Sequence, residues 1–109
     1  MLITTENRME RAGTVNRLGP VNGEYVIEEK TFRGILAEMK EYEEIRTPAY
    51  EKELEKAKET VMNQMIKKAE GLGANAIIGL NIYHEIVAHG TMMLVAGKGI
   101  AAEVDESEV

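Results

Sequence analysis

The clearest hydrophobic pattern in the chain is a stripe of apolar side chains between residues 48 and 72. Its members fall three or four positions apart, and Glu and Lys fill most positions between them. This spacing predicts one long amphipathic helix. Thr47 is suited to cap its N-terminus, Pro48 to its first turn, and Gly71 or Gly73 to its end. The stripe consists of Tyr50, Leu54, Ala57, Val61, Met65, Ala69 and Leu72.

Shorter patterns precede this helix. The segments RAGTVNRLG at 11–19 and VNGEYVI at 21–27 predict two short strands, with a bend at Gly19-Pro20 between them. Thr31 is placed to cap a second, shorter helix, and the polar run from Glu41 to Arg46 would link it to the long one. The apolar positions with helical spacing in this shorter helix are Phe32, Ile35, Leu36 and Met39.

The glycine-rich stretch GLGANAIIGL at 71–80 raises the question of a phosphate-binding loop. Such a loop runs from a strand through glycines into a helix, so that the amides at the helix N-terminus face the anion. Here the order is reversed, because the helix comes first and an apolar strand follows from Ala76 to Val87. A helix C-terminus presents carbonyl groups, which repel phosphate. The stretch therefore predicts the end of a helix rather than a nucleotide site.

The last two strands are predicted to form a hairpin around His89-Gly90, a sequence suited to a tight turn. A two-residue turn there would pair Ala88 with Thr91. Each step of one residue away from the turn on both strands then gives the next pair. Directly opposed residues share a face of the sheet. The resulting pairs are Ile86 with Met93, His84 with Val95, and Ile82 with Gly97.

Both faces of this hairpin are largely apolar. The first carries Ile78, Leu80, Ile82, His84, Ile86, Met93 and Val95, with Gly97 and Gly99 leaving room for a helix. The helices can cover one face only, so we expect the second to be an interface between copies of the chain. Its expected contact residues are Tyr83, Val87, Met92, Leu94 and Ile100, interrupted by the polar residues Asn81, Glu85 and Lys98. A slip of one residue in either strand would exchange the faces.

Composition narrows the class of protein. The chain has 109 residues, and we expect one domain over residues 1–102 followed by an acidic, disordered tail at 103–109. The formal charge is −6 and the 13 basic residues are mostly interleaved with Glu, which argues against a nucleic-acid partner. The absence of cysteine fits a reducing cytoplasm. The polar N-terminus and the lack of a long apolar run predict neither a signal peptide nor a membrane partner.

Several motifs resemble a known family. AYEKEL at 49–54, LGANAIIGL at 72–80 and GTMMLV at 90–95 are its specific marks, and ITT near the start and GPVNGEYV at 19–26 also fit. The chain is similar to the YbjQ-like proteins, small domains catalogued as heavy-metal-binding whose biochemical function is not established. The resemblance implies an α+β subunit like that of dodecin, with an antiparallel sheet packed on one long and one short helix. It also implies assembly into a ring, typically a pentamer.

A metal site has few candidate ligands in this sequence. The chain has two histidines and no cysteine, whereas transition metals need several N, S or O donors converging at about 2.0–2.3 Å. His84 and His89 are five positions apart, roughly 16 Å along a strand at about 3.3 Å per residue. Relatives in the resembled family often carry acidic residues at the positions of Asn81 and Tyr83. A divalent metal is therefore expected only if ring symmetry brings copies of His84 together.

The polar residues of the second face leave two interpretations open. Asn81, Glu85 and Lys98 could form a polar network between subunits, or they could line a pocket for a small polar ligand. Catalysis is the least expected role, because no nucleophile–base pair is visible and Glu85 is the only plausible acid–base group there. No catalytic or cofactor-binding residue is predicted. The sequence thus favours a homo-oligomeric structural or small-ligand-binding module, with a symmetric metal-binding protein as the alternative.

Overall fold

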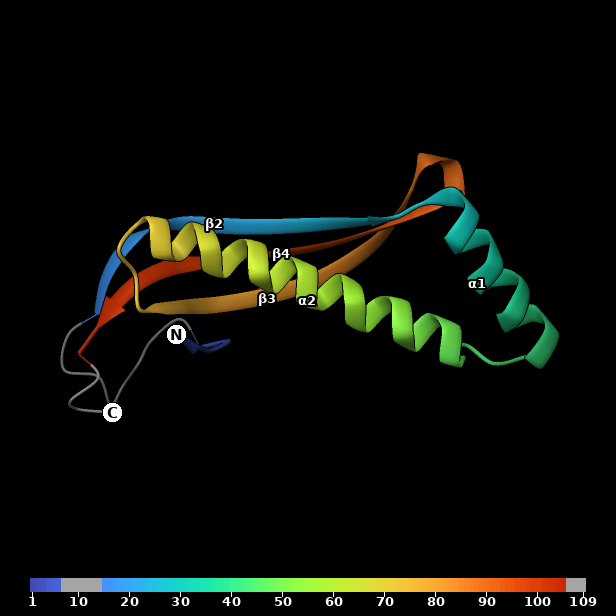
Figure 1. Ribbon diagram of the computed structural model, residues 1–109, viewed down its shortest axis with the longest axis horizontal. Coiled ribbons are helices and arrows are strands. Elements are labelled where there is room, and N and C mark those ends of the chain that lie inside the picture. The colour runs from blue at the N-terminus through green and yellow to red at the C-terminus, as the bar shows by residue number, and fades with distance from the viewer. Residues whose placement is uncertain (7–14, 106–109) are drawn as a thin grey trace.

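The computed structural model describes residues 1–6 and 15–105. Within these residues the strands form one mixed sheet in the order β1-β3-β4-β2 (Figure 1). The fold is α+β, as predicted, but the sheet is not purely antiparallel, because β1 pairs with β3 in parallel. The elements in chain order are β1 (Leu2–Ile3), β2 (Val15–Ile27), α1 (Glu29–Tyr42), α2 (Pro48–Gly71), β3 (Ala76–Val87), the short 3₁₀ turn η1 (Ala88–Gly90) and β4 (Met92–Val104).

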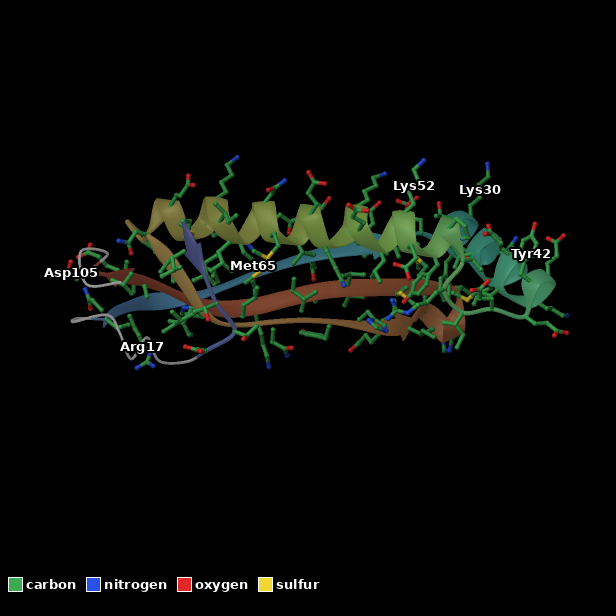
Figure 2. The ribbon with its side chains drawn as sticks, turned by 90° about the horizontal axis from the view of Figure 1, so that it is seen from below. Arg17, Lys30, Tyr42, Lys52, Met65 and Asp105 are labelled. Carbon is green, nitrogen blue, oxygen red and sulfur yellow. The ribbon has the colours of Figure 1, made fainter. Side chains whose placement is uncertain are left out.

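The long helix α2 lies along one face of the sheet, mainly over β2 and β4 (Figures 1 and 2). Its N-terminus is capped as predicted, since Thr47 Oγ1 accepts a hydrogen bond from the backbone N–H of Tyr50 at 3.3 Å. The predicted stripe faces the sheet, and its central members are fully buried, although Leu72 at the end is 47 % exposed. These central members are Ala57, Val61, Met65 and Ala69.

Glycines allow α2 to approach the sheet closely. Gly23 and Gly97 are directly opposed in β2 and β4, and both lie beneath the helix. A Cβ atom at Gly97 would lie 2.7 Å from Val61 Cγ1 and 2.8 Å from Met65 Sδ. A Cβ atom at Gly23 would lie 2.6 Å from the carbonyl oxygen of Val61. Gly97 therefore has the predicted role, and Gly23 shares it.

The short helix α1 differs from the prediction at both ends. It begins at Glu29, with Glu28 as a cap residue that makes no side-chain cap bond, so Thr31 is not its cap. The earlier start is favoured because the N–H of Phe32 bonds to the carbonyl of Glu28 at 2.9 Å. At the other end the helix continues through Tyr42, which shortens the predicted linker. Phe32 and Ile35 are buried in the main core, as their spacing predicts.

The N-terminal segments form one strand rather than two. From Val15 to Ile27, β2 is continuous, and the predicted bend at Gly19-Pro20 is only a register shift between Arg17 and Gly19. Pro20 does not interrupt the strand, because β2 is at the edge of the sheet and a proline there loses no ladder bond. The part of the first predicted strand at 11–14 lies outside the described residues.

Two side chains of α2 occupy the outer edge of β2. Gln64 Oε1 accepts a hydrogen bond from the backbone N–H of Glu24 at 2.9 Å. One turn later, Lys68 Nζ donates to the carbonyl oxygen of Asn22 at 2.8 Å and to its Oδ1 at 3.0 Å. These are the backbone groups that another strand would need for pairing, so α2 closes the middle of this edge.

The hairpin register follows the prediction from Asn81 to Val87. Ile82 opposes Gly97, His84 opposes Val95 and Ile86 opposes Met93. The turn is wider than the predicted two residues. Ala88, His89 and Gly90 all have positive φ, and the N–H of Thr91 bonds to the carbonyl of Ala88. The ladder therefore ends at Val87 with Met92, one pair earlier than predicted.

A bulge changes the face assignment at the start of β3. The register shifts between Ile78 and Asn81, and Gly79 has φ 62°. Ile78 was predicted to face the helix, but the extra residue turns it to the opposite face, where it pairs with Ile100. Ile77 instead packs in the core beneath α2. The assumption that side chains alternate regularly between the two faces is wrong here, because it requires an uninterrupted ladder.

A second, smaller cluster fills the end of the sheet on the face away from α2. Ala76, Ile78, Ala102 and Val104 are buried there, with Leu2, Val15 and Ile100 packed against them. Asn75 secures this end, since its Nδ2 donates to the carbonyl of Val104 at 2.9 Å and its Oδ1 accepts from the N–H of Val104 at 2.8 Å. Because β4 continues through Val104, the predicted tail does not begin at Glu103. Residues 106–109 lie outside the described residues.

Candidate functional site on the open sheet face

The candidate site lies on the face of the sheet away from α2. Figure 2 shows α2 on one side of the strands, and across the described ranges no helix covers the other side between the second cluster and the hairpin turn. We call this region the open face. It consists of four rows across β3, β4 and β2: Asn81–Lys98–Asn22, Tyr83–Ala96–Glu24, Glu85–Leu94–Val26 and Val87–Met92.

Most of the predicted contact residues share this open face. Tyr83 is 41 % exposed there, and Val87, Met92 and Leu94 are half-buried. Ile100 is on the same face but lies farther along, against the second cluster. Strand β2 adds an apolar member that the sequence did not predict, since Val26 is 44 % exposed beside Leu94.

The predicted polar cluster is only partly brought together. Asn81 lies directly opposite Lys98, as predicted, whereas Glu85 lies two rows away opposite Leu94. Within residues 1–6 and 15–105, no hydrogen bond or ion pair joins these three side chains. The structure instead places Asn22 and Glu24 of β2 beside Lys98 and Ala96. No local sequence signal could identify them, because the strand with which β2 pairs depends on contacts between residues that are far apart in the sequence.

A hollow of about 340 Å³ opens around Ala96. Lysine, asparagine, glutamate and tyrosine side chains surround it, and two glycines expose backbone in its wall. Its charged and polar side chains are suited to binding a small polar ligand, and in the described residues no hydrogen bond joins the Glu24 carboxylate to Tyr83 or to either lysine. The lining residues are Asn22, Gly23, Glu24, Lys68, Tyr83, Ala96, Gly97 and Lys98.

His84 lies on the other side of the sheet. It opposes Val95 and lines a groove of about 330 Å³ between β3 and the N-terminal half of α2. His89 lies in the hairpin turn. The described part of the chain contains no group of three or more metal-ligating side chains, and the sequence has no cysteine. The described residues of a single chain therefore do not fit a heavy-metal ion, which prefers thiolate and imidazole ligands.

Tyr25 ties β2 to α2 on the helix side. Its hydroxyl donates to Glu53 Oε1 at 2.9 Å, and its ring lies 6.0 Å from Lys56 Nζ. The hydrogen bond to Glu53 raises the pKa of the Tyr25 hydroxyl, and burial and the Glu53 charge act in the same direction, while Lys56 opposes them. A phenol with a raised pKa stays protonated near neutral pH, so the Tyr25 hydroxyl keeps the proton that it donates to Glu53.

None of the described helices combines the length and the apolar character needed to cross a membrane.

Comparison with known proteins gives consistent matches over nearly the whole chain. The model of the YbjQ family, described as "Putative heavy-metal-binding", matches residues 1–105. A UPF0145 protein of Carboxydothermus hydrogenoformans is 36 % identical over 96 residues, which cover 88 % of this chain and 90 % of the relative. A UPF0145 protein of Anoxybacillus flavithermus is 34 % identical over 106 residues, covering 97 % of this chain and 100 % of the relative.

A solved structure has the same fold. It is a protein of unknown function from the DUF74 family of Pediococcus pentosaceus, and it aligns with a TM-score of 0.61 over 96 % of this chain and 98 % of that one. At 21 % sequence identity, this likeness supports the fold alone.

Proposed function

The chain belongs to the YbjQ family, and we propose that it works as a homo-oligomeric module whose subunits associate through the open face. The observation that carries the proposal is the group of exposed apolar side chains on the part of this face toward the hairpin turn, where no helix covers it. Tyr83 and Val26 are more than two-fifths exposed there, and Leu94 lies between them on β4. Contiguous apolar surface on a soluble protein usually marks an interaction site.

The assembly we propose is a closed ring of dodecin-like subunits, with five copies as the expected number. On the β2 side, the closed edge supports contact through faces rather than by extending the sheet. Gln64 and Lys68 already occupy backbone groups of β2, so a neighbouring strand cannot add along the middle of that edge. Burying apolar side chains of the open face against a second copy would then supply the driving force, at roughly 25 cal/mol per Å².

Two charged substitutions on the open face test the assembly. We expect the double variant Tyr83→Asp/Leu94→Asp to be monomeric, because two unpaired carboxylates would be buried in the interface at high cost. Native mass spectrometry of untagged protein, with light scattering during gel filtration, gives the subunit number.

The matched control changes the same residue types outside the open face. Tyr42 is 64 % exposed and Leu36 is 43 % exposed, both on α1, and Tyr42→Asp/Leu36→Asp should keep the wild-type mass. Circular dichroism of both variants checks that they fold. A monomeric wild type, or the same mass for both double variants, would contradict the proposed interface.

A metal-binding protein is the second candidate, supported by the family description and by the accessible His84. Since the described residues of one subunit provide no group of three or more ligands, such a site needs copies of His84 from several subunits. The variant His84→Ala should then lose bound metal, whereas His89→Ala should retain it. Zinc content per subunit after incubation with Zn²⁺ and gel filtration, measured by mass spectrometry, checks this. Equal zinc content in the wild type and His84→Ala would exclude the candidate.

A further inference from the structure

We propose that the hollow around Ala96 binds an acidic amino acid, a small molecule with two carboxylates and one ammonium group. The inference deepens the proposed function, because the hollow lies on the open face and would be bounded by a second copy in the assembly. It rests on the shape of the hollow and on the charges around it, which are argued in turn.

The shape follows from one small residue among large ones. Along β4, Ala96 lies between Leu94 and Lys98 on the same face, and across the sheet it lies between Tyr83 and Glu24. Its methyl group leaves a depression that the neighbouring side chains surround. The volume of about 340 Å³ is at the lower end of the range for small-molecule sites. The hollow therefore suits a ligand of the size of an amino acid.

The charges come from three elements of the fold. Lys98 of β4 lines the hollow, and Lys68 reaches it from α2 around the edge of β2. Lys68 Nζ is held there by two neutral oxygen atoms of Asn22, at 2.8 Å and 3.0 Å. Among the described residues, neither lysine forms an ion pair with a carboxylate. Two ammonium groups thus face the hollow without a neutralising partner.

Glu24 of β2 adds one carboxylate to the lining, beside Ala96, and it also makes no ion pair within the described ranges. The fixed charges of the hollow are therefore two positive and one negative. An acidic amino acid carries the complementary set, with one carboxylate for each lysine and an ammonium group for Glu24. Charge-assisted hydrogen bonds of this kind are the stronger class, and they give specificity.

Ligands of other classes would leave at least one of these three charged groups unpaired or repelled. Inorganic phosphate could bind the lysines, but Glu24 would repel it. A neutral polyol would leave all three charges unpaired when it displaced their water. A dicarboxylate without an amine would satisfy the lysines and leave Glu24 facing negative charge. The ammonium group of the ligand is thus the feature that Glu24 selects.

Isothermal titration calorimetry with four probes, L-glutamate, L-glutamine, glutarate and inorganic phosphate, tests this assignment. L-Glutamate should bind the wild type more tightly than L-glutamine or glutarate, each of which lacks one of the three charges. Lys98→Met should weaken glutamate binding by about tenfold or more, the usual loss when one hydrogen bond to a charged group is removed. Lys52→Met removes an exposed lysine of α2 that does not line the hollow, and it should bind glutamate like the wild type.

The variant Glu24→Gln gives the sharpest result. It should weaken glutamate binding and strengthen glutarate binding, because the same change removes an attraction for the first ligand and a repulsion for the second. Loss of both ligands, or no change in either, would overturn the role of Glu24. Phosphate binding as tight as glutamate binding would overturn the ligand class.

Gel filtration with light scattering on the same samples separates this inference from the proposed assembly. An intact oligomer that binds no glutamate at millimolar concentration would overturn the ligand site and leave the assembly standing. A monomer that binds glutamate with the expected variant pattern would overturn the assembly and support the site.

Discussion

Replacing Gly97 with valine is expected to destabilise the fold by at least about 3 kcal/mol, the upper part of the range for overpacked cores. The first added carbon would already lie within 2.8 Å of both Val61 and Met65. Both are fully buried side chains of α2, so neither can move into solvent. The helix would have to lift from β4 and give up its contacts along the sheet. Guanidinium unfolding followed by circular dichroism, at fixed protein concentration, measures the free energy of unfolding.

A glycine with free space around it provides the control. Gly34 is an exposed residue of α1, and a Cβ atom there would meet nothing within 4 Å. Gly34→Ala should therefore stabilise the protein by about 0.5–1 kcal/mol, because alanine is the better helix former. Equal unfolding free energies for Gly97→Val and the wild type would show that α2 does not pack as closely as described.

Removing the ring of Phe32 is expected to cost about 3–5 kcal/mol, the usual range for a buried phenylalanine replaced by alanine. Phe32 is one of only two buried residues of α1 in the described chain, with Ile35. Figure 1 shows α1 extending beyond the end of the sheet, where few other elements lie against it. Phe32→Ala should therefore loosen α1 before the rest of the molecule unfolds.

Hydrogen exchange separates local from global loss in this variant. We expect the amides of α1 to exchange much faster in Phe32→Ala, with smaller changes in α2 and β4. Leu36→Ala on the same helix is the control, since this side chain is 43 % exposed and surface changes usually alter stability by less than about 0.5 kcal/mol. Equal exchange rates in the two variants would contradict an anchoring role for Phe32.

The sequence predicted those elements whose signals are local. The pair Thr47-Pro48 marks the start of α2, Gly71 marks its end, and His89-Gly90 fixes the register of the hairpin. Because that register held from Asn81 to Val87, four of the five expected contact residues fell together on the open face, and Ile100 lies on the same side. Spacing alone could predict these positions, since each depends on counting from a nearby turn.

The wrong face assigned to Ile78 has a non-local cause. The bulge at Gly79 is held by the N-terminal backbone, as the N–H of Gly79 bonds to the carbonyl of Glu6 at 2.7 Å and that of Leu80 to Thr4 at 3.0 Å. The sequence of β3 by itself does not contain this information. The hollow has the same origin, because Glu24 and Lys68 reach it only after β2 has paired beside β4 and α2 has packed across both strands.

The closed edge of β2 also limits how this protein can aggregate. Amyloid fibres grow because each added strand leaves a fresh, equally receptive edge for the next molecule. Here the two edges are unequal, since Gln64 and Lys68 occupy β2 while β3 beyond its pairing with β1 has no strand beside it in the described residues. A molecule that docked by β3 would present a blocked surface behind it. Strand-by-strand polymerisation would thus stop after a single step.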